Sequence, residues 1–165
     1  MTSIRRLALV AALVAAPASL GAQNSLRFGL AAGPYRVDNL AGTPIVPTLM
    51  LLKPAGQRGI FGGNLGLIKS AGFYGLNALT LDLHAGLRSQ PATLEWLGTV
   101  GPTFIAGGDG DGTPYTSVGG QATTGVTWWA GKHIGVVALA TGRVWFTTGN
   151  STFSPGGSIG IVLRR

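Results

Sequence analysis

The feature that most constrains the fold is an alternation of apolar and polar residues in the stretch FYGLNALTLDLHAGLR, residues 73–88. Apolar residues, mostly leucines, recur at every second position of its second half, and polar residues such as Thr80, Asp82 and His84 lie between them. Because successive side chains of an extended strand point to opposite faces, this stretch is predicted to be a β-strand with one apolar face. The apolar face fits either a buried core or a lipid-facing barrel wall.

The N-terminal segment has the pattern of a secretory signal peptide. An arginine pair precedes a ten-residue apolar run, and Ala22 offers a small residue for cleavage. The run is shorter than the roughly 20 residues that a membrane-spanning helix needs. We therefore expect removal of residues 1–22 on export, or slightly fewer if cleavage occurs near Ala18, and one folded domain over residues 23–165.

The composition favours membrane strands over an ordinary soluble domain. Charged residues make up 10% of the chain, whereas soluble domains average roughly 25%. The chain has no cysteine, so no disulfide framework is available. Its formal net charge is +7, but the basic residues are scattered singly apart from terminal pairs. They form no basic patch, and a nucleic-acid partner is not expected.

Stretches with a period of two continue along the chain and predict eight strands. The predicted strands cover residues 25–32, 43–53, 58–69, 73–88, 94–104, 115–130, 134–147 and 158–164, and the first could extend to residue 37. Pro44 and Pro47 interrupt the second, since proline removes a donor from the ladder. Residues 38–42 and 107–112 are predicted loops.

Strand number and chain length agree with a membrane barrel. A barrel strand takes about 9 to 11 residues to cross the bilayer, so eight strands fit the exported chain and ten would be the upper limit. The fold class predicted is therefore all-β, a closed antiparallel up-and-down transmembrane β-barrel of eight strands, acting as a monomer.

Aromatic residues near both ends of the predicted strands are a second, independent signal. Those near the periplasmic ends are Phe28, Phe61, Trp96 and Trp128, and those near the outward ends are Tyr35, Phe73, Phe104, Tyr115 and Phe146. This distribution is typical of the two interfacial girdles of membrane barrels. Aromatics that pack in a soluble β-core are the alternative, but a core does not predict clustering at both ends.

Together these features resemble the small eight-stranded outer-membrane β-barrels of the OmpA/OmpX type. The resemblance covers residues 25–165 and rests on strand number, alternation, girdles, the segment ALTLDLHAGLR and the signal peptide. It implies residence in the cell outer membrane, contact with outer-membrane lipid, and insertion by the barrel-assembly machinery. Such barrels usually end in an aromatic residue, whereas this chain ends in Leu163-Arg164-Arg165.

Strand parity separates two sets of candidate residues. The predicted lipid-facing set is Leu79, Leu81, Leu83, Leu87, Trp96 and Trp128. The predicted polar network that fills the lumen is Arg27, Asp82, His84, Arg88, Glu95 and Arg143. With a turn at residues 89–90, His84 is predicted to lie opposite Glu95, with Asp82 and Arg88 within one further pair.

A carboxylate beside an imidazole could orient a catalytic base, but the predicted neighbours include no well-placed serine nucleophile. A structural charge network is therefore favoured, and no catalytic residue or enzyme activity is predicted. Asp109 and Asp111 lack the further oxygen ligands of an EF-hand calcium loop, and the two histidines have no cysteine partners. No metal or cofactor is predicted.

The leading hypothesis is a small integral outer-membrane barrel with a structural or surface-interaction role. One alternative is a soluble exported β-barrel or sandwich that binds an apolar ligand. The other is a lipid-modifying barrel enzyme, which would require a nucleophile that the pattern does not supply.

Overall fold

The computed structural model describes residues 24–37, 40–42, 44–69, 77–89, 92–108, 114–147 and 150–164. The strands in these ranges are β1 (Ser25–Ala32), β2 (Tyr35–Val37), β3 (Leu40–Gly42), β4 (Ile45–Ala55), β5 (Gly59–Lys69), β6 (Asn77–Arg88), β7 (Leu94–Gly108), β8 (Pro114–Trp129), β9 (Ile134–Thr147) and β10 (Asn150–Arg164). Within the same ranges, no helix is long and apolar enough to cross a membrane.

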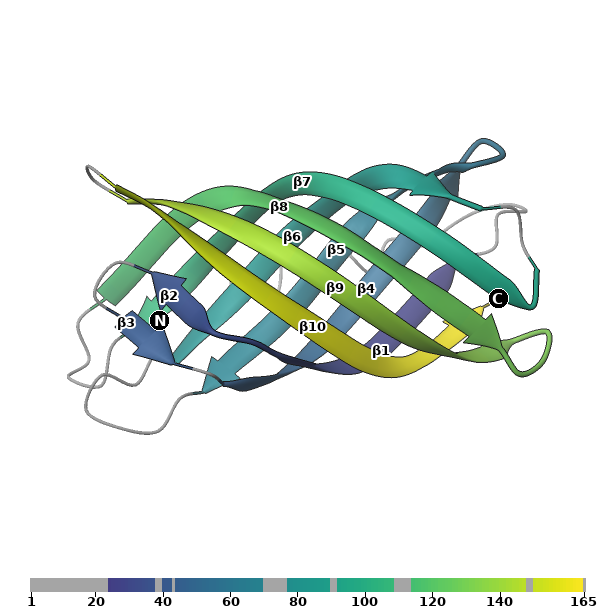
Figure 1. Ribbon diagram of the computed structural model, residues 1–165, viewed down its shortest axis with the longest axis horizontal. Helices are drawn as coiled ribbons and strands as arrows, with labels where there is room; N and C mark the ends of the chain where they lie inside the picture. Colours follow the sequence, from purple (N-terminus) through teal and green to yellow (C-terminus); the bar gives the residue numbers. More distant parts are fainter. Residues whose placement is uncertain are drawn as a thin grey trace, which may run out of the picture.

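Eight of these strands form one closed sheet, in the order β1, β10, β9, β8, β7, β6, β5, β4. Each pairing is antiparallel, and the strands run obliquely around a single barrel (Figure 1). The barrel closes between the first and last strands, where Ser25 pairs with Arg164 and Ala32 with Gly157. The predicted closed antiparallel barrel of eight strands is confirmed.

The first connection differs from the predicted loop. β2 and β3 pair as a separate two-stranded sheet at one end of the barrel, with Tyr35 opposite Gly42 and Val37 opposite Leu40 (Figure 1). The sequence predicted a loop over residues 38–42, and that was wrong for Leu40–Gly42. Three residues are too few to display a period, so only pairing with β2 identifies this strand.

The last strand is longer than predicted. β10 begins at Asn150 rather than residue 158, and its ladder with β9 runs from Asn150 opposite Thr147 to Leu163 opposite Ile134. The segment NSTFSPGG has the composition of a loop, because Ser, Pro and Gly dominate it. Its strand structure comes from the neighbouring β9, which pairs with it residue by residue.

Two other boundaries shift. β4 continues through Pro54 to Ala55, so the turn follows at Gly56, whose positive φ of 72° favours glycine. β7 continues to Gly108 and takes in part of the predicted glycine-rich loop. The signal peptide, residues 73–76 and the pair Asp109 and Asp111 lie outside the described residues.

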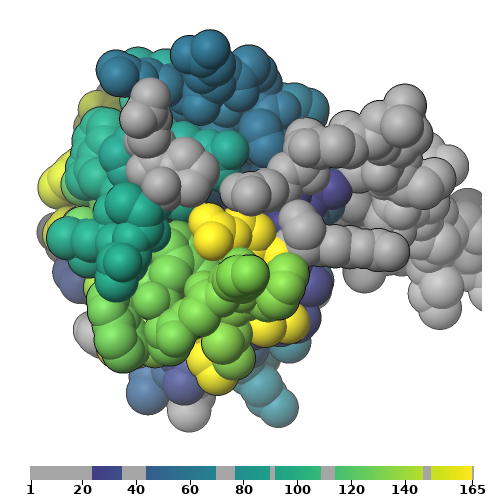
Figure 2. All heavy atoms as spheres, turned by 90° about the vertical axis from the view of Figure 1, so that its right-hand side faces the viewer, coloured from purple at the N-terminus to yellow at the C-terminus, as the bar shows by residue number. Residues whose placement is uncertain are grey.

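The inner wall of the barrel is mixed rather than polar. Apolar side chains gather at both ends of the lumen. At the end that carries β2 and β3 the cluster is Val46, Ile68, Ala78, Ile105 and Trp145. Toward the other end lie Met50, Leu52, Ile60 and Leu97, and beside them Trp129, Val137 and Val162. Figure 2 looks onto this second end, where atoms of β8 to β10 gather. The sequence predicted a polar lumen, because the apolar residues on one face of each strand were assigned to lipid. The apolar residues on the opposite, inward face were not considered.

Candidate functional site

The predicted lipid-facing residues all lie on the outer wall of the barrel. Leu83 is 42% exposed, and Leu87, Trp96 and Trp128 are exposed as well. Leu79 and Leu81 are half-buried and have the same strand parity as Leu83. The leucines of β6 therefore do not form an internal core.

The apolar outer surface continues around the whole barrel. Every one of the eight barrel strands contributes at least one large exposed apolar side chain: Phe28, Leu30, Ile45, Phe61, Leu67, Leu83, Leu87, Leu94, Trp96, Val100, Phe104, Val118, Val126, Trp128, Ile134, Val136, Phe146, Phe153, Ile159, Ile161 and Leu163. Among the described residues of the barrel strands, the charged residues with outward parity are Lys53 and Lys69, near strand ends. The middle of the outer wall is thus free of charge in these ranges.

The aromatic residues divide between the two walls. Phe28, Phe61, Trp96 and Trp128 are exposed near one end of their strands, and Phe104, Phe146 and Phe153 are exposed toward the other. The prediction that Tyr115 belongs to the outer girdle is wrong, because its side chain packs inside against the cluster around Trp145. Its parity is that of the inward-facing Ser117, so the alternation of β8 places Tyr115 on the inner wall although it lies near a strand end. The side chain of Tyr35 and all of Phe73 lie outside the description.

Asp82 is the centre of the first polar network in the lumen. It is 1% exposed, and its carboxylate accepts a hydrogen bond of 2.7 Å from Arg143 Nη2 and one of 3.0 Å from Asn64 Nδ2. The hydroxyl of Thr103 donates to the other carboxylate oxygen. Four strands, β5, β6, β7 and β9, are joined at this one residue. A buried carboxylate with several charge-assisted bonds holds its neighbours in fixed positions.

Glu95 is the centre of a second network near the other end. Its carboxylate lies 3.9 Å from Arg88 Nη1 and 4.0 Å from Arg164 Nη1, and it accepts a hydrogen bond of 3.2 Å from Trp129 Nε1. The Arg164 guanidinium also stacks over the Trp129 ring at 4.1 Å. The sequence pattern did not predict that Arg164 and Trp129 contact Glu95, because both residues lie far from Glu95 in the sequence.

The predicted pairing of His84 with Glu95 is wrong. In the β6–β7 ladder, Ala85 lies opposite Val100 and Arg88 opposite Leu97, so Glu95 lies beyond the end of β6. The ladder ends with Ser89 N donating to Trp96 O at 2.8 Å. The connection is therefore longer than the two-residue turn assumed, and the extra residues shift the register.

His84 instead contacts two neutral side chains. Its Nδ1 lies 2.8 Å from Thr99 Oγ1 and 3.0 Å from Gln121 Nε2. Both partners approach the same ring nitrogen, whereas a catalytic triad needs a nucleophile on one nitrogen and an orienting acid on the other. The described residues around His84 do not form that arrangement.

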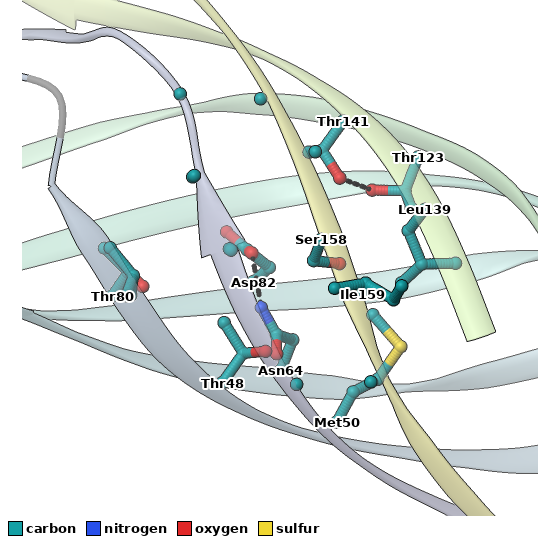
Figure 3. Close-up of a pocket in the computed structure, with 18 of the residues that line it drawn as sticks. Thr48, Met50, Asn64, Thr80, Asp82, Thr123, Leu139, Thr141, Ser158 and Ile159 are labelled. Carbon is teal, nitrogen blue, oxygen red and sulfur yellow. Dashed lines mark hydrogen bonds between the residues drawn. The ribbon is translucent and has the colours of Figure 1, made fainter. Parts of the chain in front are cut away.

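The remaining predicted network residue, Arg27, is 4% exposed and lies on the inner wall of β1. It lines a cavity of about 60 Å³, together with Asp82, His84 and Arg143. Figure 3 shows polar groups converging on this cavity, including Asn64 hydrogen-bonded to Asp82 and Thr123 hydrogen-bonded to Thr141. Within the described ranges, no group of three His, Cys, Asp or Glu residues is placed to hold a metal ion.

The fold and its inner and outer walls define a small eight-stranded β-barrel of the outer-membrane type. No family model matches the chain, and no curated protein sequence does so either. Among solved structures, it is similar to Neisserial surface protein A, with 11% sequence identity, a TM-score of 0.61, and coverage of 88% of this chain and 98% of that one. Ail, the attachment invasion locus protein of Yersinia pestis solved with the heparin analogue sucrose octasulfate, matches at 10% identity and a TM-score of 0.62, over 88% of this chain and 100% of that one. The N-terminal β-barrel domain of Pseudomonas aeruginosa OprF matches at 10% identity and a TM-score of 0.61, with the same coverage. At these identities the similarity concerns the fold.

Proposed function

We propose that this chain is an integral barrel of the bacterial outer membrane with a structural or surface-interaction role. One observation carries the proposal: the outer wall exposes large apolar side chains on all eight strands, and its outward-facing charges, Lys53 and Lys69, lie near strand ends. Soluble monomers rarely expose contiguous apolar patches above a few hundred Å². A lipid bilayer is the solvent that this surface matches.

The soluble alternative is less well supported. A soluble barrel that binds an apolar ligand needs a water-compatible outer wall and an apolar internal pocket. Here the outer wall is apolar, and the cavity measures only about 60 Å³ and is lined by charged and hydroxyl-bearing side chains as well as apolar ones. Binding pockets for small molecules are typically about 300–1,000 Å³.

A role at the cell surface draws support from the neighbours of similar fold. One of them is described as a surface protein and another as an attachment invasion protein solved with a heparin analogue. For this chain the corresponding proposal is that the loops at the β2–β3 end contact an external partner while the wall anchors them. A catalytic role has no assembled site among the described residues of the lumen.

The test of membrane residence uses single cysteines, because the native chain has none. Cysteines at Leu79, Leu81 and Leu83 are spin-labelled, and a quencher confined to lipid should reach all three, whereas a water-soluble thiol reagent should reach none. Thr80, buried on the opposite face of β6, is the matched control that the lipid quencher should not reach. Lys132, exposed in the β8–β9 turn, is the control that the soluble reagent should reach.

Cell fractionation and heat-modifiability on gels complete the test. The protein should fractionate with the outer membrane and migrate differently when folded and when boiled. Reaction of the three leucine positions with the water-soluble reagent, or recovery of the protein in the soluble periplasmic fraction, would contradict membrane residence.

A further inference from the structure

The lumenal cavity has a specific structural cause. It lies against β1 and β10, whose inward positions beyond Arg27 carry small residues: Gly29, Ala31, Gly156, Ser158 and Gly160. The facing strands present Asn64 and Asp82 (Figure 3). His84 belongs to the same lining. Because one wall has almost no side-chain volume, the facing side chains leave an open volume of about 60 Å³. A cavity needs about 10–15 Å³ to hold one water, so this one has room for more than one.

Polar groups on one part of the lining show what kind of occupant that part suits. Hydroxyl groups of Thr48, Thr123, Thr141 and Ser158 line it (Figure 3). Buried polar groups are costly unless they are hydrogen-bonded. This part of the lining is therefore suited to a polar occupant, and apolar side chains such as Met50, Val137 and Leu139 line the rest of the cavity.

Arg27 is a charged residue of this lining. Its Nε and Nη1 atoms have no hydrogen-bond partner among the described residues. It is 4% exposed, so bulk water does not solvate its charge. Glu95 is near enough to attract Arg27 electrostatically, but its carboxylate already contacts Arg88 and Arg164. An unpaired buried cation is unfavourable, and a small anion would compensate it.

His84 adds a second donor to the same cavity. Gln121 Nε2 donates to the carbonyl of Leu83 at 2.9 Å and also lies 3.0 Å from His84 Nδ1. Nδ1 is therefore the acceptor, and in the neutral ring Nε2 carries the proton. His84 Nε2 is buried and has no hydrogen-bond partner among the described residues. Asn64 Oδ1 is a buried unpartnered acceptor in the same lining, and a water bound to the anion would satisfy it.

The charge balance of the inner wall points the same way. Among the described inward-facing residues, the cations are Arg27, Arg88, Arg143 and Arg164, and the anions are Asp82 and Glu95. Asp82 is engaged by Arg143, and Glu95 by two arginines. The inner wall therefore has two excess positive charges, one at Arg27 beside the cavity and one at the Glu95 cluster, where two arginines share a single carboxylate.

We propose that the cavity between β1, β10 and the Asp82 network is a binding site for one small inorganic anion of chloride size, held by Arg27 and the Nε2–H of His84. The site is independent of any role of the outer wall or loops, since it depends only on the closed barrel. Bound anion would link β1, the first strand of the barrel, to β6.

The direct test is diffraction from crystals of the detergent-solubilised barrel soaked in sodium bromide. An anomalous bromide peak should appear beside Arg27 and disappear in Arg27→Met. The matched control, Arg58→Met, makes the same chemical change in an exposed turn and should keep the peak. Ordered water without an anomalous peak, or a peak that persists in Arg27→Met, would overturn the proposal.

A solution measurement covers the case in which Arg27→Met does not fold. Thermal unfolding midpoints are compared in sodium bromide and in sodium gluconate, whose anion is too large for the cavity, at equal ionic strength. Bromide should raise the wild-type midpoint in a saturable manner, since a ligand that binds only the folded state stabilises it. Gly156→Leu should abolish the increase while keeping the charge, because a Cβ at Gly156 meets nothing closer than Ala32 O at 3.5 Å and its side chain would enter the cavity. Equal wild-type midpoints in the two salts, or an unchanged increase in Gly156→Leu, would contradict the site.

Discussion

Trp145 and Phe146 are adjacent in β9, and they illustrate the difference between the two walls of the barrel. Trp145 is fully buried in the lumen, where it packs with side chains from four other strands, whereas Phe146 is 57% exposed on the outer wall. The outer position needs only an apolar side chain of suitable size. The inner position needs a shape and a set of partners that other strands determine. Sequence changes should therefore act through different physical terms on the two walls.

The largest expected effect concerns the Asp82 network on the inner wall. Asp82→Asn leaves Arg143 as an uncompensated buried charge and should reduce the free energy of unfolding by about 3–5 kcal/mol. The double variant Asp82→Asn with Arg143→Met should recover most of that loss, because both charges are gone. Urea unfolding of the refolded barrel measures both values. A double variant as unstable as the single one would show that the charge pair is not the cause.

The next prediction compares the loss of stability at Trp145 with that at Phe146, its neighbour in β9. Trp145→Ala should cost about 3–5 kcal/mol, since it removes transfer free energy and leaves a cavity. Phe146→Ala should cost only the transfer term, about 1.5–3 kcal/mol, if its side chain leaves water for lipid on folding. The same urea titrations in lipid vesicles test this. A Phe146→Ala cost near zero would mean that the outer wall faces water.

A charge introduced on the outer wall should lower the stability of the barrel by an amount that depends on its depth in the bilayer. Leu83→Arg, within β6, should destabilise the folded barrel by roughly 2–4 kcal/mol, whereas Leu87→Arg, next to the strand end, should cost about 0–1 kcal/mol. Equilibrium unfolding in vesicles gives both numbers. Equal costs at the two positions would argue against a lipid-facing wall with an interface near Arg88.

The smallest expected signal is the ion conductance of the lumen. An eight-stranded barrel has an interior just wide enough for side chains, and apolar clusters lie toward both ends of this one. Purified protein in planar bilayers should show no steady porin-like conductance. Stable large openings would require the inner wall to rearrange from the packing described above.

Much of the fold could be predicted from the sequence because its main signal is local. Alternation in segments such as residues 79–88 assigns each side chain to a wall, and strand parity depends only on adjacent positions. Strand number followed from chain length and turn residues. The parts that were missed, β3 and the first half of β10, lack a local signal, since their strand structure depends on pairing with β2 and β9.

The sequence by itself determined the class of fold, the eight barrel strands and the inward or outward parity of Arg27, Asp82, His84 and Leu83. Only the tertiary structure decided which inward residues meet. His84 contacts Gln121 instead of the predicted Glu95, because loop length between β6 and β7 sets a register that alternation cannot report. The cavity beside Arg27 likewise exists only because closure brings the small residues of the first and last strands together. Side-chain direction is a property of neighbouring residues, whereas register and closure depend on contacts between residues far apart in the chain.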